Sequence, residues 1–221
     1  RQSKNDVYNN VIIPDLRAAM SALSSSNAAD AGGRATSNAA QALLGKVYAS
    51  MGNYSAAATE LKAVIDGAAG AGISLQTNFE DIFGMENDLN SEILFATQMS
   101  STAGITKTSL DLFPNWYGGA NTKADPVDNA PIDQDLIDAF AASTGDLRTA
   151  LTLDGTISVK YDLVTPGDHD WIEIRLTDVI MLYAEALNEN GSSAAEVLAL
   201  LDPIRMRAGV PALDASTINN K

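Results

Sequence analysis

The chain has 221 residues, of which 46% are hydrophobic and 19% charged, and its formal net charge at pH 7 is -14. This composition suits a globular protein with a sizeable core and argues against global disorder. The 14 basic residues are scattered, so we expect no nucleic-acid partner, because phosphate binding needs clustered Lys and Arg. The absence of cysteine excludes disulfides, thiolate catalysis and cysteine-based zinc sites.

The sequence begins Arg1-Gln2-Ser3-Lys4, without an initiator methionine and without an apolar signal-peptide region behind it. No apolar run reaches the ~18 residues that a membrane helix needs. We therefore expect a processed or trimmed piece of a longer protein, without a membrane span in this part.

Residues 6–70 are predicted to form a helical region. Its first part, residues 6–23, has apolar residues at helical spacing, and Pro14 predicts a kink or a helix start nearer to the proline. A hairpin follows, with one helix from Thr36 or Ser37 to about residue 51 and another over residues 54–65. The glycine and asparagine between these two helices favour a short turn, so the helices should be antiparallel.

This hairpin carries the residue spacing of a tetratricopeptide repeat. The matching positions are Leu44, Gly45, Tyr48, Gly52, Tyr54, Ala57 and Leu61. The small residues Gly45 and Ala57 allow the helices to approach closely, whereas Tyr48 and Leu61 are expected to fill the space toward a neighbouring hairpin. The usual tryptophan is replaced by Gln41, and the terminal proline is absent.

Residues 71–165 are predicted to be an irregular insertion that faces the ligand. The expected elements are a helical turn over 79–83, an extended segment over 93–98, a polar loop over 100–130, a helix capped by Asp133 and a strand over 156–164. Long loops in compact domains are often functional, which makes this insertion the first place to look for ligand contacts.

Residues 166–210 are predicted to form a second tetratricopeptide-like hairpin. Its first helix is expected over residues 172–188, with Trp171 packing against its start, and its second helix begins at the capping box of Ser193 and Glu196. Pro203 predicts a bend in the second helix. The first helix is apolar nearly all round, as expected of a helix that is covered by its own partner and by the next repeat.

Glu185 is the only charged residue between positions 179 and 187 of that helix. A buried carboxylate without a partner is destabilising, so a structural ion pair is the preferred interpretation and a ligand contact the alternative. The candidate partners are Arg34, Arg205 and Arg207. Hairpin geometry favours a pair between Asp178 and Arg205, which leaves the partner of Glu185 open.

The sequence carries none of the specific motifs of catalysis or metal binding considered below. No nucleophile elbow, P-loop or dinucleotide fingerprint occurs, so we expect no enzyme and no cofactor. His169, between Asp168 and Asp170, could bind a metal, but adjacent residues rarely converge on one ion, and a solvated loop is the preferred interpretation. Residues 125–135 offer oxygen ligands for calcium but lack the spacing and glycine of an EF-hand, so no metal site is expected.

Four segments, in this order, resemble the SusD/RagB family of surface-exposed outer-membrane lipoproteins of Bacteroidetes. They read GRATSNAAQALLGKVYASMGNYSAAATELKAVID, NSEILFATQ, IDAFAASTGDLR and RLTDVIMLYAEALNENG…IRMRAG. The resemblance implies a mostly α-helical fold of tetratricopeptide-like hairpins, with a loop-rich insertion and a few short strands. Residues 1–221 would then form one incomplete SusD-like domain, about half of a typical member.

The resemblance also implies a binding function without chemistry. Members of the family capture a nutrient, usually an oligosaccharide and in some cases a peptide, at the outer membrane on the cell surface. They act with a SusC-like TonB-dependent outer-membrane barrel, and a lipid anchor outside this chain would provide the membrane association. The alternatives are a tetratricopeptide scaffold that binds protein partners in its concave groove and a glycan-cleaving enzyme, for which no specific motif is present.

The candidate ligand-binding residues are Asn115, Trp116 and Tyr117 in the segment LFPNWYGG. Sugar rings have apolar C–H faces that stack on aromatic rings, and their hydroxyls pair with polar groups such as the side chain of Asn115. The alternative for Trp116 is that it folds inward and holds the loop.

Overall fold

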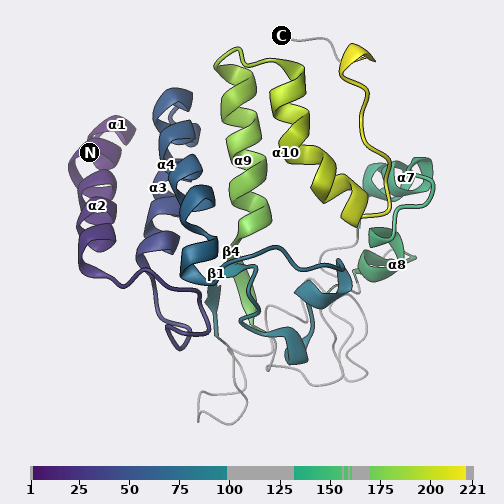
Figure 1. The fold of residues 1–221 in the computed structure, drawn as a ribbon, viewed down its shortest axis with the longest axis horizontal. Coiled ribbons are helices and arrows are strands. Elements are labelled where there is room, and N and C mark those ends of the chain that lie inside the picture. The colour runs from purple at the N-terminus through teal and green to yellow at the C-terminus, as the bar shows by residue number, and fades with distance from the viewer. Residues whose placement is uncertain (1, 99–131, 156, 159, 161–169, 218–221) are drawn as a thin grey trace.

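The computed structural model of the chain describes residues 2–98, 132–155, 157–158, 160 and 170–217, and it is mostly helical (Figure 1). At the N-terminus, α1 (Lys4–Val7), a π-helical turn η1 (Tyr8–Ile12) and α2 (Ile13–Ala22) follow one another without a break. The amide of Ile13 donates to the carbonyl of Tyr8, five residues back. This wide turn lies just before Pro14, which has no backbone N–H to donate. The helix therefore continues through Pro14 and does not begin there.

The predicted first hairpin is confirmed as α3 (Ser37–Ser50) and α4 (Tyr54–Gly67). Thr36 caps α3, since its hydroxyl accepts from the amide of Ala39 at 3.2 Å. Gly52 takes a φ of 74° in the turn, the left-handed conformation that glycine adopts without steric cost. The side chain of Asn53 then caps α4.

The second hairpin consists of α9 (Leu176–Glu189) and α10 (Ala194–Arg207), and its first helix starts later than predicted. Trp171–Arg175 form strand β4, which pairs antiparallel with β1 (Ile93–Thr97). The expectation that Trp171 packs against a helix start is therefore wrong, because Trp171 lies opposite Thr97 in the sheet. The capping box at Ser193 is confirmed, and α10 continues through Pro203. Figure 1 shows the lower part of α10 turning toward α7.

The helices α2, α3, α4, α9 and α10 lie side by side in this order (Figure 1). The second helix of the first hairpin, α4, packs directly on α9, although residues 68–175 separate them in the sequence. Tyr48 is buried in the core of this wall, and Tyr183 packs against the same core. The two predicted hairpins therefore share one continuous helical wall.

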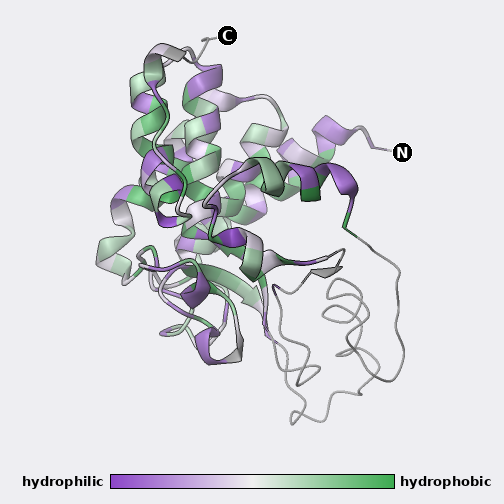
Figure 2. Cartoon of the chain, turned by 90° about the vertical axis from the view of Figure 1, so that its right-hand side faces the viewer, coloured by the Kyte–Doolittle hydropathy of each residue, from purple (hydrophilic) through white to green (hydrophobic). Residues whose placement is uncertain are grey.

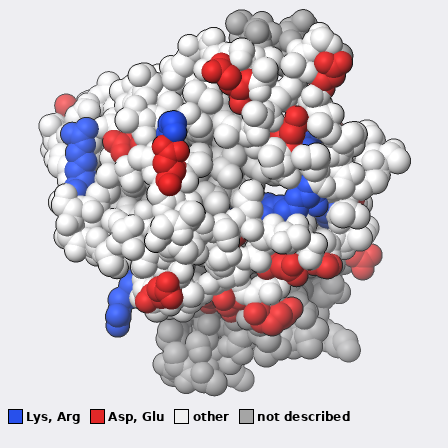
Figure 3. Space-filling view, in the orientation of Figure 1, with Lys and Arg blue, Asp and Glu red and all other residues white. Residues whose placement is uncertain are grey.

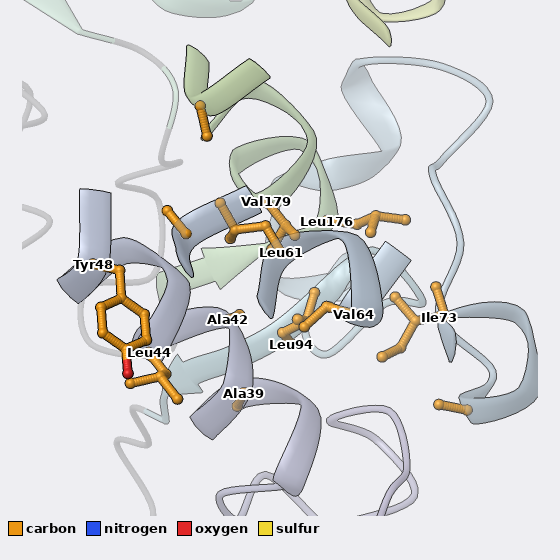
Figure 4. Close-up of a cluster of buried hydrophobic side chains, with 14 of the residues drawn as sticks. Ala39, Ala42, Leu44, Tyr48, Leu61, Val64, Ile73, Leu94, Leu176 and Val179 are labelled. Atoms are coloured by element: carbon orange, nitrogen blue, oxygen red, sulfur yellow. The ribbon is translucent and has the colours of Figure 1, made fainter. Parts of the chain in front are cut away.

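The core of the wall lies between α3, α4, α9 and strand β1. Figure 4 shows Leu61 of α4 beside Val179 of α9, and Val64 beside Leu94 of β1. Leu44, Leu61 and Leu94 have no exposed surface. An ideal Cβ on Gly45 would lie 2.5 Å from Cγ of Leu61, which confirms that a glycine is needed where the two helices cross.

The remaining described elements are short; η5 (Ala215–Thr217) lies near the C-terminus at the upper end of the wall, and the others lie toward its lower end (Figure 1). The others are the 3-10 turns η2 (Ala69–Ala71), η3 (Glu80–Ile82) and η4 (Met85–Asn87), the helices α7 (Gln134–Ala142) and α8 (Arg148–Thr152), and the strands β2 (Leu153–Asp154) and β3 (Ile157–Ser158). The predicted turn near residue 80, the strand at 93–97 and the cap by Asp133 are confirmed. Strand β3 pairs with β2 as a small hairpin, and the rest of the strand predicted over 156–164, apart from residue 160, lies outside the described residues.

The surface is mixed and mainly acidic. Hydrophobic and hydrophilic residues alternate along the helices, as expected when each helix has a buried and a solvated side (Figure 2). On the face drawn in Figure 3, acidic residues outnumber scattered basic ones, and no extended basic area is seen. In the described part of the chain, no helix has the length and apolar character needed to cross a membrane.

Candidate functional site

The three predicted ligand-binding residues, Asn115, Trp116 and Tyr117, lie outside the described residues. Their role in ligand binding therefore stays a prediction. The oxygen ligands considered for calcium between residues 125 and 131 also lie outside the described residues.

The sequence DHD, considered as a metal site, is described only at its third residue. Asp170 is buried, and its amide donates to Oδ1 of Asp88 at 3.3 Å, so its backbone is fixed to another segment of the irregular region. His169 and Asp168 lie outside the described residues. Among the residues that the structure describes, no group of three or more potential ligands could hold a metal ion.

A buried cluster of polar side chains centres on Glu92, the residue directly before β1. The Glu92 side chain has no exposed surface, and Nη1 of Arg207 lies 2.5 Å from its Oε2. Nη1 of Arg175 lies 3.4 Å from the other oxygen, Oε1, and the hydroxyl of Thr177 donates to Oε1 at 2.5 Å. The backbone amide of Gln76 donates to Oε2 at 2.9 Å. Both carboxylate oxygens of Glu92 are thus held by several donors.

This cluster, named here the Glu92 cluster and comprising Gln76, Glu92, Arg175, Thr177 and Arg207, joins segments that are distant in the sequence. Arg207, the last residue of α10, also donates to the carbonyl of Gln76 at 3.0 Å and to the hydroxyl of Thr177 at 2.8 Å. Thr177 lies in the first turn of α9, and the amide of Leu176 donates to the carbonyl of Glu92 at 2.8 Å. The cluster therefore fixes both helices of the second hairpin to the irregular insertion.

Sequence reasoning did not identify Glu92. The available signal was weak: a single carboxylate directly before an apolar strand, in the segment NSEILFATQ. Its partner Arg207 lies 115 positions away, and no helical or strand periodicity relates residues at that separation. Arg207 was considered as a partner, but for a different carboxylate.

The predicted environment of Glu185 is wrong. Glu185 is exposed and forms no hydrogen bond or ion pair with any described residue. The reason is that α4 and α10 cover only part of the surface of α9, and Met181 on the same side of α9 is 49% exposed. An exposed carboxylate needs no protein partner because water solvates it.

The predicted pair between Asp178 and Arg205 is also wrong. Because α9 starts at Leu176, Asp178 lies in its first turn and accepts from the amide of Arg175 at 3.2 Å. The Arg175 guanidinium also approaches Asp178, with 3.6 Å between Nε and Oδ1. Nε of Arg205 donates instead to the carbonyl of Pro211 at 3.1 Å.

The uncovered side of α9 lines a groove of about 640 Å³. It is bounded by Lys46 of α3, by Asp178, Met181, Leu182, Ala184, Glu185 and Asn188 of α9, and by Val197 and Leu201 of α10. Most of these side chains are apolar, with a few charged groups of both signs among them. This lining suits contact with an apolar surface of a partner better than it suits catalysis.

A second group of side chains gathers where β4 meets the irregular insertion. The rings of Phe79 and Phe83 lie 5.4 Å apart at a tilt of 58°. Nζ of Lys160 lies 4.3 Å from the centroid of the Phe83 ring, and the guanidinium carbon of Arg175 lies 5.7 Å from the same centroid. Burial, together with the charges of Arg175 and Arg148, lowers the pKa of Lys160 to about 8, while the charge of Asp178 opposes the shift. Two aromatic rings and two cations thus form one compact group.

Asp146 is expected to make the free energy of unfolding depend on pH in the acidic range. Its side chain is 1% exposed and accepts from Nη2 of Arg148 at 2.6 Å, and this bond holds the pKa of Asp146 below its usual value of 3.8. A carboxyl whose pKa is lowered on folding stabilises the fold above 3.8 and loses this contribution as the pH falls toward the folded pKa. We expect Asp146→Asn to lower the free energy of unfolding at neutral pH, modestly because Arg148 is 42% exposed. Urea unfolding of both proteins over a pH series should show the difference shrinking below 3.8; a constant difference would contradict it.

The helical wall and its irregular insertion are similar in fold to solved structures of SusD-type proteins. The chain is similar to a SusD superfamily protein from Parabacteroides distasonis, with a TM-score of 0.76 and 22% identity over 98% of this chain and 54% of that one. It is similar to a laminarin-binding SusD-like protein, with a TM-score of 0.71 and 24% identity over 96% of this chain and 56% of that one. The surface glycan-binding protein A from Bacteroides uniformis gives a TM-score of 0.71 at 19% identity, over 96% of this chain and 51% of that one.

A model of the SusD family matches residues 161–221 of the chain. The predicted resemblance to the SusD/RagB family is therefore confirmed, both in the family match and in the fold. The chain spans about half the length of the solved structures that it matches. No curated protein matched the sequence of the chain.

Proposed function

We propose that this chain is part of a carbohydrate-binding protein of the SusD type that captures nutrient at the cell surface. The observation that carries the proposal is the likeness of the fold to a laminarin-binding SusD-like protein and to a surface glycan-binding protein. The match of residues 161–221 to the SusD family supports it independently of the fold comparison.

The ligand in this proposal is an oligosaccharide, and the protein carries out no chemistry on it. The fully buried carboxylate of the described insertion, Glu92, supports this view, because guanidinium, hydroxyl and amide donors hold both of its oxygens. A carboxylate held in this way is neither free to accept a proton from a substrate nor accessible to it.

The proposal also includes a location at the outer membrane and a protein partner. The protein would be held at the outer membrane by a lipid anchor outside this chain and would act with a SusC-like TonB-dependent barrel. The helical wall of α2, α3, α4, α9 and α10 offers a rigid scaffold for such a partner, whereas the insertion would meet the ligand. A peptide ligand is the alternative within the same family.

Replacing Trp116 by alanine is expected to weaken glycan binding about tenfold or more, because stacking of an aromatic ring on a sugar would be lost. Affinity gel electrophoresis with laminarin and a panel of other polysaccharides, on the protein as its gene encodes it, measures the effect. Tyr8→Ala serves as a control, since Tyr8 lies in the N-terminal helical segment beside Lys4. Equal retardation of the wild-type and Trp116→Ala proteins would remove Trp116 from the site.

A protein-binding scaffold is the second candidate, and the groove between α3, α9 and α10 favours it. The same gels separate the two functions, because a scaffold predicts no retardation by any glycan. Product analysis after incubation with the polysaccharides tests the third possibility, a glycan-cleaving enzyme.

A further inference from the structure

Lys160 lies close to other cations and forms no ion pair with any of the residues that the structure describes. Its ammonium lies 4.3 Å from the centre of the Phe83 ring, and the guanidinium of Arg175 lies over the same ring at 5.7 Å. Arg148 of α8 also repels Lys160. Two cations therefore repel Lys160 here, in a protein whose formal net charge is -14.

The neighbouring cations have carboxylate partners, whereas Lys160 has none within the described residues. Arg175 pairs with Glu92 and with Asp178, and Arg148 pairs with Asp146 at 2.6 Å. The structure gives Lys160 the Phe83 ring but no ion pair in the described part of the chain. The Asp178 carboxylate attracts Lys160, but it is already engaged by Arg175.

A cation that is largely withdrawn from water is unfavourable unless an anion compensates it. The face of an aromatic ring supplies only part of that compensation. The lowered pKa of Lys160, about 8, is the physical consequence of this position, because burial and Arg175 both disfavour the charged form. A bound anion would reverse this effect and hold the proton on Lys160.

We propose that Lys160, together with Arg175 beside it on Phe83, forms a subsite for an anionic substituent of a bound oligosaccharide. The shared chemistry is a carboxylate of a uronic acid or a sulfate ester, and the inference rests on the proposed glycan-binding function. Phe79, whose ring lies 5.4 Å from that of Phe83, adds apolar surface next to the subsite. In this proposal the ligand is an acidic glycan and not a neutral one.

The test compares three probes in affinity gels at about pH 7: laminarin as the neutral glycan, polygalacturonate for carboxylates and carrageenan for sulfate esters. We expect Lys160→Met to weaken binding of an anionic probe about tenfold or more, because a charge-assisted contact is lost. Lys46→Met is the matched control, since Lys46 lies on α3 at the separate helical groove. Thermal unfolding of each variant verifies that it is folded.

The pH dependence adds a readout that a structural role of Lys160 would not give. Above the Lys160 pKa of about 8, the wild type should lose affinity for the anionic probe. Lys160→Arg should keep it, because a guanidinium stays protonated. The charged groups that face Lys160 are Arg175, Arg148 and Asp178.

Three results decide the matter. Binding of polygalacturonate or carrageenan that depends on Lys160 supports the subsite and shows which anion it takes. Binding of laminarin alone, or anionic binding that is unchanged in Lys160→Met, overturns the subsite and leaves the glycan-binding function intact. Binding of no glycan at all overturns both proposals.

Discussion

Replacing Arg207 by methionine is expected to lower the free energy of unfolding by about 3–5 kcal/mol, the usual cost of breaking a buried ion pair on one side. The change leaves the Glu92 carboxylate, which has no exposed surface, without its nearest guanidinium. Arg175 remains at 3.4 Å, but it is shared with Asp178 and cannot replace two donors. Equilibrium unfolding in urea, with the slope of the transition unchanged, measures the loss.

Arg205→Met is the matched control, because Arg205 lies two positions earlier on the same helix. Among the described residues, the carbonyl of Pro211 is its partner, to which its Nε donates, so we expect a loss of about 1 kcal/mol or less. Adding Glu92→Gln to Arg207→Met should recover part of the stability, since the uncompensated buried charge disappears. If Arg207→Met behaves like Arg205→Met, the Glu92 cluster does not stabilise the fold in the way described.

The Glu92 cluster also connects the helical wall to the proposed anion subsite. Arg175 takes part in both, because one side of its guanidinium reaches Glu92 and the group also lies over the Phe83 ring. The cluster therefore determines where Arg175 stands relative to Lys160. Weakening it should affect acidic-glycan binding through the position of Arg175, beyond its effect on stability.

The helical hairpins could be predicted because their signals are local. Thr36 and Ser193 cap their helices by hydrogen bonds to residues three positions later in the sequence. Gly52 favours the turn because it can adopt a positive φ, which depends on no distant residue. Residues 172–175 were predicted as the start of the helix, although the isoleucines at positions 172 and 174 suit a strand as well as a helix. These residues form a strand because they pair with residues 93–97, and nothing in the local sequence indicates that partner.

The candidate site was less accessible to sequence reasoning. Lys160, Phe83 and Arg175 come from three separate segments, and only the fold brings them together. The exposure of Glu185 likewise depends on which faces of α9 its neighbours cover, and helical periodicity does not specify this. Trp116 was identified by its residue type and by its place in a predicted loop, and that prediction still awaits its test.

Replacing Gly45 by alanine is expected to destabilise the fold by about 1–2 kcal/mol, although alanine is the better helix former by about 1 kcal/mol. The new methyl group would lie 2.5 Å from Cγ of Leu61 and 2.6 Å from its Cδ2. Leu61 has no exposed surface, so its side chain has no free space into which to turn. Overpacking therefore outweighs the gain in helix propensity. Gly67→Ala is the control, because a Cβ there meets no atom within 4 Å, and it should be neutral or stabilising.

The sign of the Gly45 effect should reverse when Leu61 is shortened. Leu61→Ala alone is expected to cost about 2–5 kcal/mol, because it leaves a cavity beside Val179 in the shared wall. In that background the methyl group of Gly45→Ala fills part of the cavity and adds helix propensity, so the double variant should be more stable than Leu61→Ala. A double-mutant cycle by urea unfolding measures this coupling. If the two changes in the free energy of unfolding are simply additive, α3 and α4 do not meet at Gly45. That result would contradict the close helix approach that the tetratricopeptide spacing implies.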